Sequence, residues 1–105
     1  MARIQVSTGS GGVQSTHSLV FGSAVSSGNS LFACYSYRTG LGISSKAEMT
    51  VSDNVNAGNW SSLVEMDLTN GLGEGVSIVY KLNISSGAAA STYRVSFDSP
   101  STHTM

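Results

Sequence analysis

The sequence predicts an all-β fold, a compact antiparallel β-sandwich of about seven strands with a jelly-roll or immunoglobulin-like arrangement. Three observations support this prediction. Ser makes up about a fifth of the 105 residues, 12 are Gly and only 10% are charged; Ser, Thr, Gly and Asn form helices poorly and turns well. No segment of useful length repeats with the helical period. β-rich runs recur about every ten residues, which is typical of one sandwich domain (1–105) and not of βαβ units.

The expected strands are runs of alternating or continuous apolar residues between Gly, Ser and Asn clusters. Leu31–Tyr37 is apolar on both faces, which predicts a central strand. Pro100 follows the last strand, and the tail Ser99–Met105 is expected to fray. The predicted strands are Arg3–Ser7, Ser15–Phe21, Ser30–Thr39, Ala47–Ser52, Trp60–Leu68, Val76–Asn83 and Thr92–Asp98.

Charge and cysteine content exclude several function classes. Five Lys and Arg stand against six Asp and Glu, so there is no basic patch for nucleic acid. No apolar run is long enough for a transmembrane helix, and no membrane association is expected. Cys34 is the only cysteine, which excludes an intrachain disulfide, and it is expected to be a small buried apolar side chain. The composition is common in secreted bacterial modules that meet polymers, which predicts an extracellular location.

Catalytic motifs are weak, and the sequence predicts a protein that is not an enzyme. Glu65 and Asp67 share a strand face about 7 Å apart, a spacing compatible with a glycosidase pair. A solvated strand face is the favoured interpretation of these two acids. The chain has no Gly-x-Ser-x-Gly elbow, phosphate loop or dinucleotide fingerprint.

A metal site has one candidate, the loop that holds Asp53, Asn54 and Asn56. Their oxygens at short spacing suit calcium better than zinc. The alternative is an Asx-turn loop in which these side chains bond to the backbone. The Asx-turn is favoured, so no cofactor is expected, and calcium remains the weaker alternative.

Several short motifs, spread over most of the chain, resemble a β-sandwich module of large secreted soil-bacterial proteins. The chain is most similar to the small carbohydrate-binding modules of soil-bacterial cellulases. Two extra residues between Asp53 and Gly58 depart from the pattern, and longer members continue past the last strand. The motifs are Arg3-Ile4-Gln5, Ser18–Phe21, Gly28–Phe32, Val51–Asn54, Gly58-Asn59-Trp60, Val79–Ile84, Gly87 and Tyr93–Phe97.

The resemblance implies a non-catalytic module that targets an attached glycoside hydrolase to plant cell-wall β-glucans. Cellulose oligosaccharides, xyloglucan and mixed-linkage glucan are the implied ligands. Sugars stack their C–H faces on aromatic rings, and their hydroxyls bond to polar groups at the rim. The stacking candidates are Trp60, Tyr35, Tyr37 and Tyr80, and the hydrogen-bonding candidates are Asn59, Arg38 and Asp67.

Each aromatic candidate also has a structural interpretation. Each Tyr could be a half-buried sheet residue with its hydroxyl at the edge. Trp60 could lie in the core or stay exposed at the mouth of a strand, and the sequence favours neither. The phenylalanines, Phe21, Phe32 and Phe97, are expected in the core.

The alternative function is a structural or adhesion module of a bacterial surface protein. A sandwich shorter than its relatives would leave unpaired strand edges, and such edges invite pairing with another chain. A homodimer through an open sheet edge is therefore a second expectation.

Overall fold

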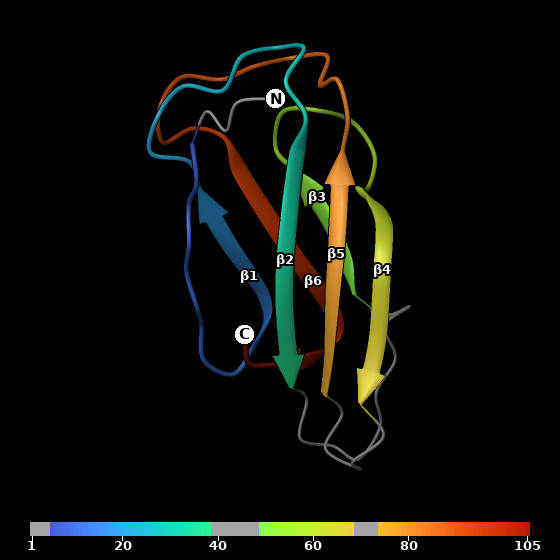
Figure 1. Ribbon diagram of the computed structural model, residues 1–105. Helices are drawn as coiled ribbons and strands as arrows, with labels where there is room; N and C mark the ends of the chain where they lie inside the picture. The colour runs from blue at the N-terminus through green and yellow to red at the C-terminus, as the bar shows by residue number, and fades with distance from the viewer. Residues whose placement is uncertain (1–4, 39–48, 69–73) are drawn as a thin grey trace.

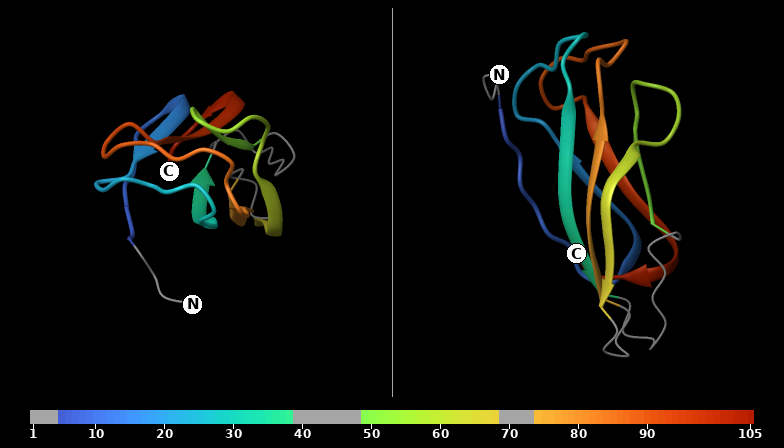
Figure 2. Two further views of the ribbon diagram at one scale, coloured as in Figure 1. Left: turned by 90° about the horizontal axis from the view of Figure 1, so that it is seen from above. Right: turned by 45° about the vertical axis from the view of Figure 1, so that its right-hand side comes forward.

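The computed structural model describes residues 5–38, 49–68 and 74–105, which fold into two antiparallel three-stranded sheets. One sheet has the strand order β1-β6-β3 and the other β2-β5-β4. The sheets face each other as the layers of a sandwich (Figures 1 and 2). The six strands within these residues are β1 (Gln14–Val20), β2 (Leu31–Arg38), β3 (Thr50–Asp53), β4 (Ser61–Leu68), β5 (Glu74–Lys81) and β6 (Arg94–His103).

The all-β sandwich prediction is confirmed, and β2, β4 and β5 lie within two residues of their predicted bounds. No described residue is helical, and none belongs to a helix long and apolar enough to cross a membrane. The prediction that β2 is central is wrong for the described pairing: β5 is central, and β2 pairs with it through eight residues as an edge strand. Both faces of β2 are apolar for separate reasons, since one lies in the core and the other on an apolar surface.

The predicted frayed tail is instead part of the fold. β6 continues through Pro100 to His103, which is 1% exposed, and Met105 packs against the core. The pairing of β6 with β1 shifts register between Asp98 and His103. A proline is tolerated at such an irregularity because no regular ladder bond is lost.

The predicted first strand, Arg3–Ser7, is not a strand over its described residues 5–7. Side-chain hydrogen bonds hold this segment in place of a ladder. Gln5 Nε2 donates to the Ser23 and Ala24 carbonyls, and Ser7 Oγ donates to the Val20 carbonyl. Residues 5–12, here called the N-terminal segment, thus lie on the β1 side of the sandwich (Figure 1).

The core fills the space between the sheets. Tyr37 of β2 packs over Gly75, its cross-strand partner in β5. A Cβ at Gly75 would lie 2.5 Å from Tyr37 Oη, so only glycine permits this packing. The buried apolar residues are Val25, Leu31, Tyr37, Met49, Val51, Trp60, Val79, Ile84, Tyr93, Val95 and Phe97.

Candidate functional site

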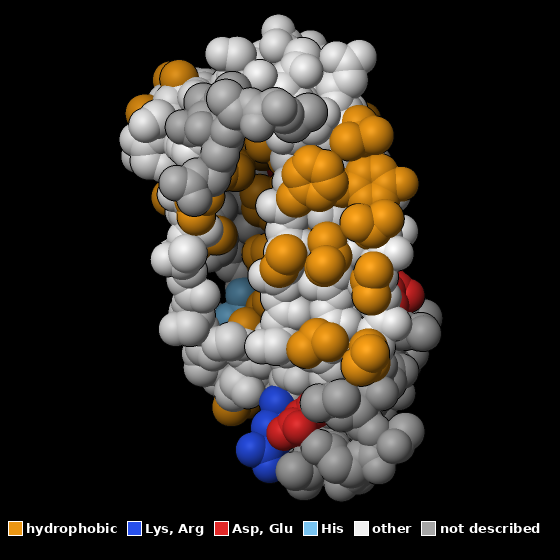
Figure 3. Space-filling model, viewed as in Figure 1, with side chains coloured by type: hydrophobic (Ala, Val, Ile, Leu, Met, Phe, Trp, Pro, Cys, Tyr) orange, Lys and Arg blue, Asp and Glu red, His pale blue; other side chains and the backbone are white. Residues whose placement is uncertain are grey.

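The outer face of the β2-β5-β4 sheet is apolar and open to solvent. Alternation along β2 turns Leu31 and Tyr37 into the core, so Phe32 and Cys34 point outward. Side chains of β4 and β5 continue the surface, and Figure 3 shows apolar side chains gathered over this face. This outer apolar face consists of Phe32, Cys34, Leu63, Val64, Met66, Val76, Ile78 and Tyr80.

A β-bulge enlarges the face on β4. The pairing of β4 with β5 shifts register between Ser62 and Val64, so Leu63 is an extra residue. Leu63 and Val64 are both exposed, at 60% and 49%, although neighbours in a regular strand would point to opposite faces. The strand predicted over Trp60–Leu68 therefore departs from regular alternation at Leu63.

Two aromatic rings lie side by side at one end of the face. Phe32 and Tyr80 are cross-strand partners, and their ring centroids are 6.3 Å apart with a 34° angle between the planes. Phe32 is 57% exposed, which overturns its assignment to the core. Strand parity places Phe32 on the face opposite Tyr35 and Tyr37, but both faces of this strand are apolar, so the sequence does not say which one is exposed. Cys34, predicted to be buried, is exposed for the same reason.

Trp60 belongs to the core. Its side chain is 7% exposed, and its Nε1 donates to Asp53 Oδ2 at 2.9 Å. The backbone of Trp60 also donates to the Val51 carbonyl at 2.7 Å. Tyr37 is likewise buried. Neither ring is available to stack on a ligand at the surface.

The loop proposed for calcium binds its own backbone. Asp53 Oδ1 accepts hydrogen bonds from the amides of Val55 and Asn56, which is an Asx-turn. Burial raises the pKa of Asp53, but hydrogen bonds from the Asn56 amide, Trp60, the Val55 amide and Tyr93 outweigh it, and the net pKa lies below its usual value. The carboxylate is thereby held in its charged form.

The two asparagines of this loop are also engaged. Asn56 is buried; its Nδ2 donates to Tyr93 Oη at 3.1 Å, and its Oδ1 accepts from Ser85 Oγ and the Ser86 amide. Asn54 bridges the Thr92 carbonyl and the Arg94 amide. Within the described ranges, no group of three or more His, Cys, Asp and Glu side chains is arranged to hold a metal. These bonds match the Asx-turn interpretation.

The other candidates do not form one site. Tyr80 is on the outer apolar face, and Arg38, at the far end of β2, is paired with Glu74 at 3.3 Å. Asn59 is exposed just before β4. Asp67 lies on β4 opposite Gly75, and its side chain is outside the described set.

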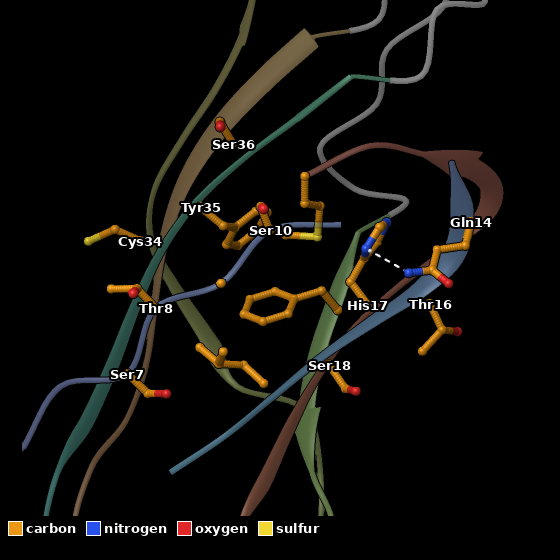
Figure 4. Close-up of a pocket in the computed structure, with 14 residues that line it drawn as sticks. Ser7, Thr8, Ser10, Gln14, Thr16, His17, Ser18, Cys34, Tyr35 and Ser36 are labelled. Atoms are coloured by element: carbon orange, nitrogen blue, oxygen red, sulfur yellow. Dashed lines mark hydrogen bonds between the residues drawn. The ribbon is translucent and has the colours of Figure 1, made fainter. Parts of the chain in front are cut away.

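Tyr35 lines a cleft between the sheets, and its ring centroid lies 5.2 Å from that of Phe97. Burial raises the pKa of the Tyr35 hydroxyl. Figure 4 shows Tyr35 on the cavity side of β2 and Cys34 pointing away from it. The cleft comprises two adjoining cavities of about 460 and 300 Å³ between β2 and the N-terminal segment.

One end of this cleft is polar. His17 and His103 lie with ring centroids 4.6 Å apart, and His17 Nε2 contacts the His103 carbonyl oxygen at 2.9 Å. Gln14 Nε2 lies 3.2 Å from His17 Nδ1 (Figure 4). Sequence reasoning missed this pair because the two histidines are 86 residues apart.

Comparison with known proteins places this chain in no group: no protein-family model, curated protein or solved structure matches it.

Proposed function

We propose that the protein is a non-catalytic carbohydrate-binding module that binds β-glucan chains on its outer apolar face. The observation that carries this proposal is the pair of neighbouring rings, the exposed Phe32 and the half-buried Tyr80, on an open sheet surface. Aromatic side chains combine a large apolar area with a polar tip in tyrosine, which suits a ligand with apolar C–H faces and hydroxyl edges. The module would be secreted, and outside the cell it would hold an attached glycoside hydrolase against cell-wall glucan.

Polar groups flank the aromatic pair. Ser61 pairs with Tyr80 across the sheet, and the exposed Asn59 lies two residues before Ser61 in the sequence. In this proposal the Tyr80 hydroxyl and Asn59 form hydrogen bonds with sugar hydroxyls. Arg38 lies at the opposite end of the face. All eight side chains of the outer apolar face are uncharged, as expected for a neutral ligand.

Isothermal titration with cellohexaose, xyloglucan and mixed-linkage glucan tests the proposal. Phe32→Ala and Tyr80→Ala should each weaken binding about tenfold or more, because stacking contributes roughly 1–3 kcal/mol per ring for nucleic-acid bases, which are also flat ligands. Val13→Ala, at a 74% exposed residue away from the face, is the matched control. A folded sample that gives no heat with any of the three glucans would refute the proposal.

A second function, a self-associating structural module, is favoured by the aliphatic part of the same face. Aliphatic side chains are poor partners for sugars, and this part of the face consists of Leu63, Val64, Met66, Val76 and Ile78. Contiguous exposed apolar surfaces commonly mark protein interfaces. A second copy would pack the same face on itself about a two-fold axis. Sedimentation distinguishes the two functions: a dimer that Leu63→Lys dissociates, without any glucan binding, supports the structural module.

A further inference from the structure

The outer apolar face is built from rows of side chains that cross the strands. Residues paired directly across antiparallel strands project from the same face of the sheet. β2 pairs with β5 and β5 pairs with β4, so each row takes one side chain from each of these three strands (Figure 1). Three successive rows are Phe32–Tyr80–Ser61, Cys34–Ile78–Val64 and Ser36–Val76–Met66.

Both aromatic rings of the face belong to a single row, here called the aromatic row (Phe32, Tyr80 and Ser61). Phe32 and Tyr80 are cross-strand partners, and their ring centroids are 6.3 Å apart. Neighbouring strands lie roughly 5 Å apart, so the rings lie side by side and the line that joins them crosses the strands. The next row holds Cys34 and Ile78, and neither is aromatic. A polymer that stacks on both rings must therefore cross the strands.

The aromatic row lies at one end of the sheet. Phe32 is the second residue of β2, Tyr80 is the second-last of β5 and Ser61 is the first of β4. A chain that followed the strands would leave the sheet in one direction and pass over aliphatic side chains in the other. A chain that follows the aromatic row stays on the sheet across all three strands.

The aliphatic rows offer sugar hydroxyls little hydrogen bonding. Ile78, Val64 and Val76 have no polar side-chain atom, and the thioether of Met66 is only a weak acceptor. A hydroxyl buried against these side chains loses its bonds to water without replacement, which costs free energy. The aromatic row reduces this cost, because two of its three side chains carry a hydroxyl.

The aromatic row becomes more polar towards β4. Tyr80, in the middle, combines a ring with a hydroxyl, and Ser61 has an exposed hydroxyl alone. The next residue, Ser62, pairs with the buried Val79 on the other face of the sheet, and its Oγ donates to Glu65 Oε1 at 2.6 Å. Ser61 therefore provides the hydroxyl at the β4 end of the outer row.

We propose that a β-glucan chain lies along the aromatic row, across the strands from β2 to β4, and that Ser61 is a further ligand-binding residue. Successive sugars stack on Phe32 and Tyr80, and a hydroxyl of the next sugar bonds to Ser61 Oγ. The inference rests on the proposed function, to which it adds the direction of the chain and a contact on β4.

A matched pair of lysine substitutions separates the two directions. Ser61 and Ser36 are both exposed serines on the outer side of an outermost described strand, but only Ser61 belongs to the aromatic row. The measurement is isothermal titration with cellohexaose. Ser61→Lys should weaken binding about tenfold or more, because it removes the hydroxyl and places a strongly hydrated ammonium in the path of the chain. Ser36→Lys should bind within about twofold of the native protein.

The pattern of losses decides the direction. Loss of affinity in Ser36→Lys alone, equal losses in both variants, or retained affinity in Ser61→Lys would overturn the proposed direction. Failure of the native protein to bind any glucan would refute the proposed function together with this inference, so the two failures are distinguishable.

Chemical-shift mapping by NMR uses the native protein and applies even if a lysine variant does not fold. Saturating cellohexaose should shift the amide signals of the aromatic row and leave those of the Ser36–Val76–Met66 row in place. Shifts that run along β5 from Tyr80 to Val76 without reaching Ser61 would overturn the proposal.

Discussion

Trp60 Nε1 donates a hydrogen bond to Asp53 Oδ2 over 2.9 Å, and this bond spans the connection between the two sheets. Asp53 ends β3 in one sheet, and Trp60 immediately precedes β4 in the other. The same carboxylate accepts the amides of Val55 and Asn56. One side chain thus fixes the turn and anchors the indole in the core.

Asp53→Asn should lower the free energy of unfolding by about 2 kcal/mol, because one of its buried N–H partners loses its acceptor. Urea denaturation at pH 7 measures the change. Asn59→Ala, an exposed substitution in the same loop, is the control and should change stability by about 0.5 kcal/mol or less. Equal effects of the two substitutions would show that the Asp53 bonds do not stabilise the fold.

Asp53 should also make stability depend on pH. Burial raises the pKa of Asp53, but its hydrogen bonds lower that pKa by more. The folded pKa therefore lies below the unfolded value of about 3.9. A lowered folded pKa gives stability that is present above pH 4 and is lost as the pH falls through the folded pKa. Thermal unfolding should show a steeper loss below pH 4 in the native protein than in Asp53→Asn. Identical acid profiles would contradict the pKa direction.

The buried state of Trp60 gives a fluorescence prediction. As the only tryptophan and 7% exposed, it should emit at short wavelength and resist quenching by iodide. Saturating β-glucan should leave the emission maximum unchanged, because the outer apolar face lies on the other side of the β2-β5-β4 sheet. Emission that shifts with glucan would move the binding site towards Trp60.

Strand positions could be predicted from the sequence because period-two patterns and Gly or Asn turns mark them, as β2 and β5 show. Which face of β2 is buried could not be predicted, since Phe32 and Cys34 on one side are as apolar as Tyr35 and Tyr37 on the other. That ambiguity concealed the most exposed aromatic residue of the candidate site.

Other differences between prediction and structure depend on pairing that no local pattern encodes. The bulge at Leu63 arises from register with the next strand, β5, and the irregularity that admits Pro100 into β6 arises from register with the distant β1. Trp60 was ambiguous because its partner Asp53 lies in another strand, and only the fold brings the two together. Side-chain chemistry indicated the Asx-turn, since its bonds are local.

Gly75→Ala should destabilise the protein by about 1–3 kcal/mol, the usual cost of overpacking. The new Cβ would lie 2.5 Å from Tyr37 Oη, so the ring or β5 must move. Gly12→Ala is the matched control, because a Cβ there meets no atom within 4 Å. Urea denaturation of both variants measures the difference. Equal stability would mean that Tyr37 does not pack over Gly75 as described.

Cys34 tests the outer apolar face with a chemical probe. Its exposed thiol lies two residues from Phe32 on the same face, so it should react with a disulfide reagent in the native protein without denaturant. A bulky adduct at Cys34 should weaken β-glucan binding about tenfold, or roughly 1.4 kcal/mol, by covering the surface beside the ring pair. Cys34→Ser, treated with the same reagent, should keep its affinity. If the adduct forms completely and glucan binding persists unchanged, the ligand does not lie across Phe32 and its neighbours.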